Sequence, residues 1–478
     1  MSQPTTTAPP TGRHRVVIIG SGFGGLFSAR ALKHADVDIV LISSTSHHLF
    51  QPLLYQVATG ILSEGVIAPS IREVLARQRN VTCLFGHVDA IDLATRTITA
   101  RTLDSTQEYS YDSLIVAAGA GQSYFGNDHF ARYAPGMKSI DDALELRGRI
   151  FGSFELAELA ASSGREQDLS RLMTFVVVGA GPTGVEMAGQ IAELSKRTLK
   201  HDFRRINSKE AHVVLVDAAD QVLPAFGTHL GGRAEARLKQ MGVEVQLGAK
   251  VVDVDNDGIV IEDKDGQRRR IEALCKVWAA GVQASPLGAQ LAEQSGAGID
   301  RSGRVEVEPD LTLPGHPEVF VVGDMISLDN LPGVAQNAIQ GGRFAARQII
   351  RRLKGEPTQP AFHYKDKGSM ATISRFSAVA SIGKAQLSGF IAWLMWLGVH
   401  LVYIIGFKSQ ITTLLHWAVS FLGRGRGERT STEQQIYARV AIEKLGDRFT
   451  PRSGLSPTPP SDQSAVPAPE QERHLSAG

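Results

Sequence analysis

Two glycine-rich loops are the residues of this sequence whose types and spacing most directly predict chemistry. The first loop, GSGFGG, follows the β-branched run VVII and precedes the helical pattern LFSARALKHA. In such a strand–loop–helix unit Gly20 makes the tight turn, Gly22 lets the backbone approach a pyrophosphate, and Gly25 lets the helix pack on the strand. The first N–H groups of the helix then bind the phosphates. The loop, which also contains Gly24, therefore predicts a dinucleotide site.

A second unit of the same kind begins about 160 residues later. The strand pattern TFVVV leads into GAGPTG, where Gly179, Gly181 and Gly184 take the three glycine positions, and then into the helical pattern VEMAGQIAELSKRTLK. One such loop is a weak signal, because glycine turns between a strand and a helix also occur for structural reasons alone. Two coincident units predict two bound dinucleotides.

The residue that ends the next strand distinguishes the two loops. After the second loop, the strand AHVVLVD ends at Asp217, whose carboxylate is suited to bond the ribose of NADH and to repel the 2′-phosphate of NADPH. The alternative is an ordinary turn residue, and the separation from Gly184 exceeds the usual spacing of about 20 residues. After the first loop, the strand DIVLIS carries Ser43 where the acid is expected. Either Ser44 or backbone groups bind that ribose, or the strand is misaligned by one residue.

Further motifs give the chain a resemblance to a known family from about Arg15 to about Gly423. They are HHLFQPLLYQVATG, SLIVAAGAG, GPTGVEMAG, KVWAAGV, VFVVGD and GVAQNAIQGG. Together they resemble the type II NADH dehydrogenases, which are single-subunit, non-pumping NADH:quinone oxidoreductases, and especially their actinobacterial members. The resemblance implies a respiratory-chain enzyme that transfers hydride from NADH to non-covalently bound FAD, and then electrons to a membrane quinone.

The resemblance also implies roles for residues outside the glycine loops. Asp324, at the end of VFVVGD, is placed by the ribityl chain of FAD, although an Asp that begins a turn after a buried strand gives the same local sequence. Glu186 lies in the first turn of a helix, where the dipole stabilises an anion, and the family places it beside the nicotinamide and flavin rings. Further cofactor contacts are implied at Gln51, Gly281 and Ala335.

Two glutamines and a lysine are candidates for the quinone side. Gln336 and Gln340 are four residues apart, so on a helix they share one face. Their amides offer hydrogen-bond donors to the two quinone carbonyls, and a polar helix face in water is the alternative. The family's AQxxxQ segment lies against the flavin, which favours the first interpretation and makes Gln336 a cofactor contact as well. By the same resemblance Lys367 stabilises developing quinol charge, whereas the alternative is a surface lysine.

These residues have to be positioned by an α/β fold with two Rossmann-like domains. At 478 residues the chain is too long for one core, and the resemblance implies that the NADH domain is inserted in the FAD domain. We expect a flexible leader, a two-segment FAD domain, an NADH domain, a membrane-anchoring region, a helical extension and a disordered tail, at residues 1–12, 13–140 with 286–365, 141–285, 366–430, 431–449 and 450–478.

Composition and the remaining reactive residues narrow the function. Fifty basic and 49 acidic residues give a net charge of +1, so no overall field attracts nucleic acid. Cys83 and Cys275 lie far apart and are most simply structural, which disfavours a flavin-dependent disulfide or sulfide oxidoreductase. A nucleotide-sensing membrane flavoprotein without turnover is a rival of another class. His47 and His48 have no partner ligands at metal spacing, so we expect no metal, and the resemblance gives them a role in shaping the FAD pocket.

A long apolar stretch predicts attachment to the cytoplasmic face of the cell membrane. Residues 389–407 carry no formal charge and could just span a bilayer, but the second run, 411–423, is too short to return. A span would therefore strand Lys408 and the following arginines outside, against the positive-inside tendency. These arginines are Arg424, Arg426 and Arg429.

We therefore expect two interfacial helices with aromatic residues at headgroup depth and basic flanks near anionic lipid. The aromatic residues are Trp393, Trp396, Tyr403 and Trp417. A buried helical hairpin or a homodimer contact is the alternative for these helices.

Overall fold

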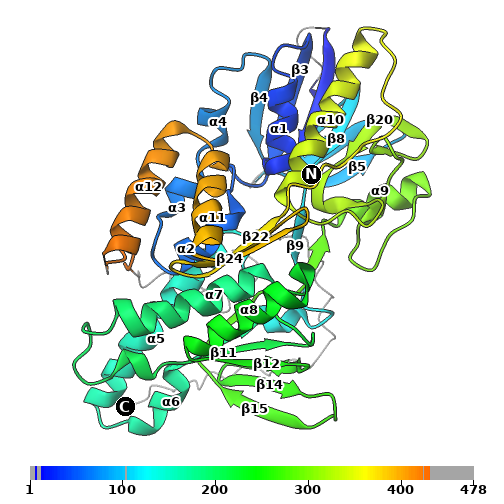
Figure 1. Cartoon of the computed structure of the whole chain (residues 1–478). Coiled ribbons are helices and arrows are strands. Elements are labelled where there is room, and N and C mark those ends of the chain that lie inside the picture. Colours follow the sequence, from blue (N-terminus) through cyan, green and yellow to red (C-terminus); the bar gives the residue numbers. More distant parts are fainter. Residues whose placement is uncertain (1–5, 8–11, 103–104, 424, 431–478) are drawn as a thin grey trace, which may run out of the picture.

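The computed structural model describes residues 6–7, 12–102, 105–423 and 425–430. Two α/β domains lie one above the other, and two C-terminal helices lie beside them (Figure 1). Each domain has its own parallel sheet, which confirms the predicted pair of Rossmann-like domains. The expected helical extension and the expected tail lie outside the described residues, as does most of the leader.

The first domain is built on a six-stranded sheet with the order β19-β20-β8-β2-β3-β4. All of these strands are parallel except β19. Strands buried on both faces favour continuous β-branched runs, and β2 and β3 have that character. The strands are β2 (His14–Ile19), β3 (Val37–Ser43), β4 (Val81–Phe85), β8 (Ser113–Val116), β19 (Thr312–Leu313) and β20 (His316–Val321). The chain leaves this sheet after β8 and returns to it at β20, so the second domain lies between two segments of the first.

Helices and a second sheet complete the first domain. Helices α1 (Phe23–Ala31) and α10 (Ala335–Leu353) pack closely, because a Cβ added at Gly342 would lie 2.4 Å from the carbonyl oxygen of Gly24. The second sheet contains β1 (Thr6–Thr7), β7 (Thr106–Ser110), β6 (Thr97–Arg101) and β5 (His87–Asp92). The shorter helices are α2 (Leu54–Ala58), α3 (Glu64–Ile67), α4 (Ile71–Val74) and α9 (Leu287–Ser295).

The second domain has a four-stranded parallel sheet and a three-stranded antiparallel sheet. The parallel strands are β10 (Thr174–Val178), β11 (His212–Asp217), β12 (Val243–Leu247) and β16 (Cys275–Trp278), and the antiparallel strands are β13 (Lys250–Val254), β14 (Gly258–Glu262) and β15 (Arg268–Glu272). Its helices are α5 (Ile140–Ser162), α6 (Leu169–Leu172), α7 (Pro182–Glu193) and α8 (Gly227–Gln240). The strands β9 (Ala120–Gln122) and β17 (Val282–Ala284) pair where the chain crosses between the two domains.

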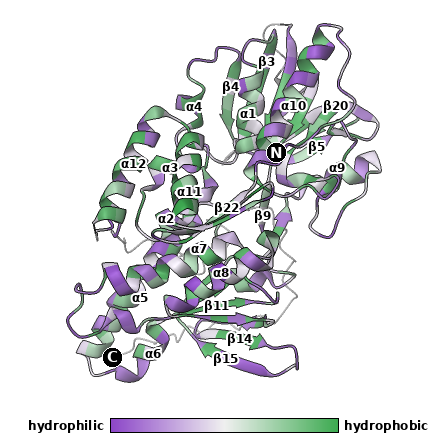
Figure 2. Cartoon of the chain, in the orientation of Figure 1, coloured by the Kyte–Doolittle hydropathy of each residue, from purple (hydrophilic) through white to green (hydrophobic). Residues whose placement is uncertain are grey.

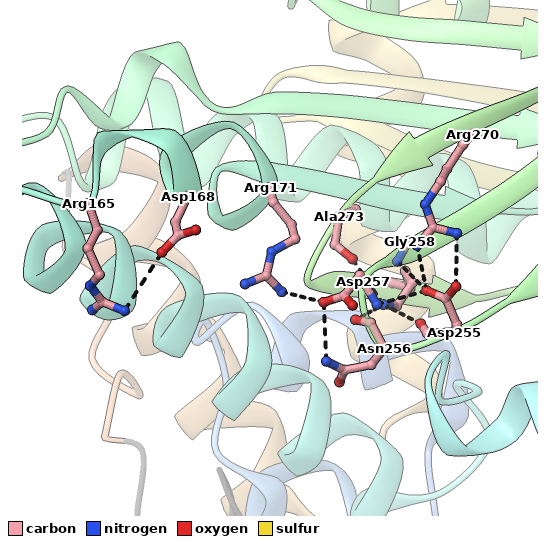
Figure 3. Close-up of polar contacts among 10 residues, drawn as sticks. Arg165, Asp168, Arg171, Asp255, Asn256, Asp257, Gly258, Arg270 and Ala273 are labelled. Carbon is pink, nitrogen blue, oxygen red and sulfur yellow. Dashed lines mark hydrogen bonds and ion pairs between the residues drawn. The ribbon is translucent and has the colours of Figure 1, made fainter.

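The second parallel sheet contains one buried lysine, Lys276, whose ammonium is bound by backbone carbonyl oxygens. Lys276 is 1 % exposed, and its ammonium donates to the carbonyl oxygens of Asp255, Asn256 and Ala273 at 2.8–2.9 Å. Burial lowers the pKa of Lys276 to about 8. Ion pairs of Asp255 and Asp257 with arginines surround the same turn (Figure 3). The lysine therefore fixes the β13–β14 turn against the sheet.

The C-terminal region begins with a three-stranded antiparallel sheet and ends with two helices. The elements are β22 (Ser369–Ser374), β23 (Ser377–Ile382), β24 (Ala385–Gly389), α11 (Phe390–Tyr403) and α12 (Phe407–Leu422). Gly406, with φ of +96°, turns the chain between the helices, so α12 starts four residues before the predicted run and contains Lys408 in its first turn. No helix in the described part of the chain is long and apolar enough to cross a membrane.

The expected aromatic belt is wrong for the three tryptophans. Trp393, Trp396 and Trp417 are 5 %, 1 % and 2 % exposed, and the indole N–H of Trp417 donates to Oε1 of Gln56 at 2.7 Å. Large indole rings bury more area against the protein, and for Trp417 the inner face also supplies a partner for the N–H. The exposed large apolar side chains are instead aliphatic or phenylalanine, and Figure 2 shows hydrophobic residues along α11 and, mixed with hydrophilic ones, along α12. We define as the apolar face the exposed Phe390, Ile391, Leu394, Val399, Val402, Phe407, Ile411, Leu414, Leu415, Val419 and Leu422.

The predicted basic flank is also wrong for Arg426. This side chain is 6 % exposed and donates to the carbonyl oxygen of Thr59 at 2.7 Å and to Oε1 of Gln190 at 2.9 Å. Arg429 forms an ion pair with Asp202. The chain after α12 therefore turns back into the protein, because buried carbonyl and amide oxygens satisfy the guanidinium there; Arg424 lies outside the described residues.

Candidate functional site

The first glycine loop has the backbone geometry that phosphate binding requires. Gly20 has φ of +101°, and a Cβ there would lie 2.4 Å from the carbonyl oxygen of Ala117. A Cβ at Gly25 would lie 1.9 Å from the carbonyl oxygen of Gly20, so only glycine lets α1 approach the strand. At Gly22, in contrast, an added Cβ meets nothing within 4 Å. The space beside Gly22 suits a pyrophosphate at the N-terminus of α1.

The second loop repeats this geometry at the start of α7. Gly179 has φ of +107°, and a Cβ at Gly184 would lie 1.7 Å from the carbonyl oxygen of Gly179. A Cβ at Gly181 would again meet nothing within 4 Å. Neither Gly22 nor Gly181 caps its helix with a side chain, so an anionic ligand fits both helix starts.

The acidic residue after the second loop has a structural role in the loop itself. Asp217 is the last residue of β11, and its carboxylate accepts hydrogen bonds from the backbone N–H groups of Ala180 and Ala219. These bonds fix the loop relative to the strand end. Its contact with a ribose stays a prediction.

A group of hydroxyls occupies the corresponding place after the first loop. Ser43 is the last residue of β3, so the strand alignment used for the sequence holds. Its Oγ lies 2.9 Å from that of Ser21 and 3.4 Å from Oγ1 of Thr45. The sequence suggested Ser44, whereas Thr45 is the residue whose hydroxyl joins this group. Uncharged hydroxyls can exchange hydrogen bonds with ribose hydroxyls in either direction.

His48 packs against the first glycine loop. Its Nδ1 lies 2.9 Å from the carbonyl oxygen of Ser21, and its ring packs edge-on against Phe23 with centroids 5.0 Å apart. Burial lowers the pKa of His48 to about 4, so the ring is neutral at physiological pH. In the described residues no cluster of side chains could hold a metal ion. A role in shaping the pocket fits this environment better than ligation does.

Asp324 lies in the turn that follows β20, beside a lysine that sequence reasoning missed. Burial raises the pKa of the Asp324 carboxyl, and the charges of Lys138 and Arg304 oppose this. Burial lowers the pKa of Lys138, while Asp324 and Asp142 act against that shift. Lys138 precedes α5 without a motif around it, so no signal in the sequence marks it.

Glu186 is buried between α7 and β22. Its Oε1 accepts a hydrogen bond from the backbone N–H of Thr372 at 3.3 Å, and burial raises its pKa well above the usual range. Burial therefore favours the protonated form of this carboxyl. A Cβ at Gly189 would lie 1.8 Å from the carbonyl oxygen of Ile373, so this glycine lets α7 lie directly against β22. Burial raises the pKa of Tyr55 well above its usual range, and an ionised Glu186 would raise it further, so the two side chains lie close together.

A second polar cluster joins the start of α10 to the end of α11. The ammonium of Lys367 donates to the Tyr403 hydroxyl at 2.9 Å, and the Gln336 amide also hydrogen-bonds that hydroxyl. The bond from Lys367 is the main cause that lowers the pKa of Tyr403. Oε1 of Gln336 is buried without a hydrogen-bond partner among the described residues. We call Gln336, Lys367 and Tyr403 the α10–α11 cluster; sequence analysis placed Tyr403 at lipid headgroups and missed its part here.

Gln340 positions the segment that carries Lys367. Its amide accepts from the backbone N–H of Lys365 and donates to the carbonyl oxygen of the same residue, both at 3.0 Å. The structure thus brings Gln336 and Lys367 together, while both hydrogen-bonding atoms of Gln340 have protein partners. A direct quinone contact of Gln340 stays a prediction.

The three remaining predicted cofactor contacts lie at the starts of elements or at the crossover. Gln51 begins a short 3-10 helix, and Ala335 begins α10. Gly281, with φ of +74°, precedes β17 at the crossover between the domains. The residues present fit FAD at the first loop, because Gly22 leaves open space and Gln336 keeps a buried acceptor without a partner.

Comparison with known proteins identifies the family. Residues 14–342 match the family model described as pyridine nucleotide-disulphide oxidoreductase. The chain is 62 % identical over 449 residues to the type II NADH:quinone oxidoreductase Ndh of Mycobacterium tuberculosis, covering 93 % of this chain and 96 % of that protein. This chain belongs to the type II NADH:quinone oxidoreductase family. The resemblance read from the motifs is confirmed.

Other relatives extend this membership. The type II NADH:quinone oxidoreductase NdhA of Mycobacterium tuberculosis is 58 % identical to this chain over 467 residues. The match covers 97 % of this chain and 96 % of NdhA. The structure of NDH2 from Plasmodium falciparum in complex with NADH matches with a TM-score of 0.78 at 20 % identity, over 86 % of this chain and 99 % of that one, which supports the fold.

The cysteines separate this chain from dithiol enzymes that share the broader family model. Cys83 lies on β4 and Cys275 on β16, in different sheets, and both are buried and free. Burial raises the pKa of the Cys275 thiol to about 12. These are the only two cysteines in the sequence, so no cysteine pair is available for disulfide chemistry at a flavin.

Proposed function

We propose that this type II NADH:quinone oxidoreductase oxidises NADH held at the second glycine loop and reduces a membrane quinone held beside the α10–α11 cluster, without pumping protons. FAD, bound non-covalently at the first loop, supplies the two-electron chemistry between them. The observation that carries the proposal is the α10–α11 cluster, in which a helix from the FAD domain and an apolar C-terminal helix share hydrogen bonds.

At the NADH end, the chain binds and orients the dinucleotide. The start of α7 offers backbone N–H groups to the pyrophosphate beside Gly181, and Asp217 keeps the loop in place. An acidic side chain near that ribose favours NADH over NADPH. The raised pKa of Glu186 favours its protonated form, so this carboxyl can hold a proton at Oε1 or Oε2 near the nicotinamide.

At the quinone end, three side chains offer donors to a carbonyl oxygen. The Lys367 ammonium and the Tyr403 hydroxyl already exchange a hydrogen bond, so a proton donor and a cation lie together. Such a pair stabilises negative charge that develops on a quinone oxygen. The Gln336 amide bonds the same hydroxyl and holds it in position. Tyr403 ends α11, so a quinone that approaches along this helix reaches the cluster directly.

We further propose that the apolar face docks on the cytoplasmic face of the cell membrane. Its side chains belong to two helices that also bury three tryptophans on the inner side, which is the arrangement of interfacial helices with one lipid-facing surface. Contiguous exposed apolar surface of this kind marks a lipid or protein contact. A homodimer through the same face is the alternative occupant.

Separate half-reactions test the catalytic proposal. Gln336→Ala removes one hydrogen bond to Tyr403, so it should slow reoxidation of the reduced flavin by a water-soluble quinone roughly tenfold and leave reduction by NADH unchanged. Gln240→Ala, at the exposed end of α8, is the matched control and should change neither step. Equal loss of both half-reactions in Gln336→Ala would contradict the quinone assignment.

Substitutions on the apolar face test the docking proposal without opening the core. The triple variant Ile391→Ser, Leu415→Ser and Val419→Ser should lose vesicle binding while its unfolding temperature stays close to that of the parent. Leu156→Ser with Leu159→Ser, exposed on α5, is the control and should still bind. Retained vesicle binding together with a lost dimer in the triple variant would assign the face to self-association instead.

A further inference from the structure

A basic groove opens beside the turn between α11 and α12. Its volume is about 1080 Å³, and it is lined by the end of α1, by the segment around α4 and by residues 405–409 with Thr412. Figure 1 shows α4 next to this turn, at the upper end of α12. The groove therefore lies where the C-terminal helices meet the first domain, and it is separate from the two glycine loops.

The charges of the groove are unbalanced and unpaired. Four lining side chains are cations that reach solvent, and Glu73 is the one lining carboxylate, which leaves a charge of +3. The cations are Arg30, Lys33, Arg77 and Lys408. None of them forms an ion pair with a carboxylate in the part of the chain that the structure describes. A local charge of +3 in a chain with a net charge of +1 favours an anionic partner.

The wall of the groove continues into the apolar face. Phe407 lines the groove and is 78 % exposed, and Ile411 and Leu415 follow on successive turns of α12 at 43 % and 62 %. The positive end of the α12 dipole lies at the same place, beside Lys408. Ser63 and Ser70 add lining hydroxyls that can donate to phosphate oxygens. A ligand that satisfies the whole surface therefore has an anionic head and an apolar body.

We propose that this groove binds the phosphate headgroup of an anionic phospholipid, whose acyl chains lie along the exposed side chains of α12. A zwitterionic headgroup brings its own ammonium toward the four cations, so an anionic lipid is favoured. The inference rests on the proposed membrane docking and deepens it. The basic surface comes from α1, from the segment after α4 and from the start of α12, where Lys408 belongs to the basic residues that the sequence predicted to lie near lipid. Lipid contact at these elements orients the FAD domain relative to the bilayer.

Vesicle sedimentation with the full-length FAD-loaded protein tests this inference. Vesicles of phosphatidylcholine alone are compared with vesicles that contain about a third phosphatidylglycerol. Arg30→Gln, Lys33→Gln, Arg77→Gln and Lys408→Gln combined should reduce partition onto the anionic vesicles roughly tenfold or more, because each cation near an anionic surface contributes appreciably. Partition onto phosphatidylcholine, and reduction of a water-soluble quinone by NADH, should stay unchanged. Inorganic phosphate at constant ionic strength should not compete.

A charge-matched control separates the groove from net charge. Arg204→Gln, Lys209→Gln, Arg233→Gln and Arg301→Gln combined remove four exposed cations outside the groove and should bind anionic vesicles like the parent. Parent-like binding by the groove variant would overturn the inference, as would an equal loss in the control variant. Strong competition by inorganic phosphate would assign the groove to a free anion and also overturn it. A parent protein that binds vesicles but reduces no quinone would refute the proposed activity alone.

Discussion

Two alanine substitutions in the second glycine loop, at Gly181 and at Gly184, separate an effect on ligand binding from an effect on folding. Gly181 has φ of −72° and ψ of −179°, an extended conformation that any residue adopts, and an added Cβ meets nothing within 4 Å. At Gly184 an added Cβ would lie 1.7 Å from the carbonyl oxygen of Gly179. The first change therefore fills the space predicted for the pyrophosphate of NADH, and the second forces α7 away from its strand.

The expected magnitudes differ accordingly. An ordinary carbon–oxygen contact is about 3.4 Å, so Gly184→Ala requires a shift of well over an ångström, and overpacking of this kind costs about 1–3 kcal/mol or more. In a large domain each kcal/mol lowers the unfolding temperature by about 2–4 °C. Gly181→Ala should change stability by no more than about 0.5 kcal/mol. It should weaken NADH binding roughly tenfold, which corresponds to about 1.4 kcal/mol.

Thermal unfolding and stopped-flow flavin reduction at varied NADH concentration measure both effects. Gly181→Ala should unfold at the parent temperature, need more NADH for half-maximal reduction, and reoxidise with quinone at the parent rate. Gly184→Ala should unfold several degrees lower. Parent-like NADH affinity in Gly181→Ala would refute the assignment of the second loop to NADH, and parent-like stability in Gly184→Ala would refute the packing argument.

Three further predictions concern the buried and paired charges. Lys367→Met should slow quinone reduction and raise the pKa of Tyr403, because its hydrogen bond is the main cause that lowers it; an unchanged phenol titration by ultraviolet absorbance would contradict this. Arg426→Met should cost about 3–5 kcal/mol of unfolding free energy, since it leaves buried acceptors unpaired, whereas Arg429→Gln should cost about 1 kcal/mol or less; equal losses in denaturant titrations would argue against the buried role. Glu186 has its pKa raised on folding, so stability is lost as pH rises from the ordinary carboxyl range toward the raised value. Glu186→Gln should remove that loss, and the same pH dependence of unfolding in both proteins would contradict a raised pKa of the buried Glu186 carboxyl.

The glycine loops and the two domains could be predicted because their physics is local. Gly20 and Gly179 have positive φ, and at Gly25 and Gly184 the helix lies too close to the loop backbone for a Cβ. Both requirements select glycine within a short motif between a strand and a helix. The position of Ser43 at the end of its strand followed from the same pattern. The apolar C-terminal run could also be predicted, because its signal is the composition of a single segment.

The sequence could not show which side of each C-terminal helix faces the protein. Trp393, Trp396 and Trp417 are interfacial residues by composition, but their rings are buried against the protein, where the indole N–H of Trp417 donates to Gln56. Arg426 likewise finds its oxygens at Thr59 and Gln190, which are hundreds of residues away in sequence. Long-range pairings of this kind leave no spacing signal in one sequence.

The visible absorption spectrum of the purified protein tests the central claim most directly. We predict a bound-flavin spectrum that bleaches when NADH is added without oxygen and returns when a soluble quinone is then added. Bleaching that quinone does not reverse would contradict the proposed quinone reduction, and a flavin that NADH fails to bleach would contradict the proposed oxidation of NADH.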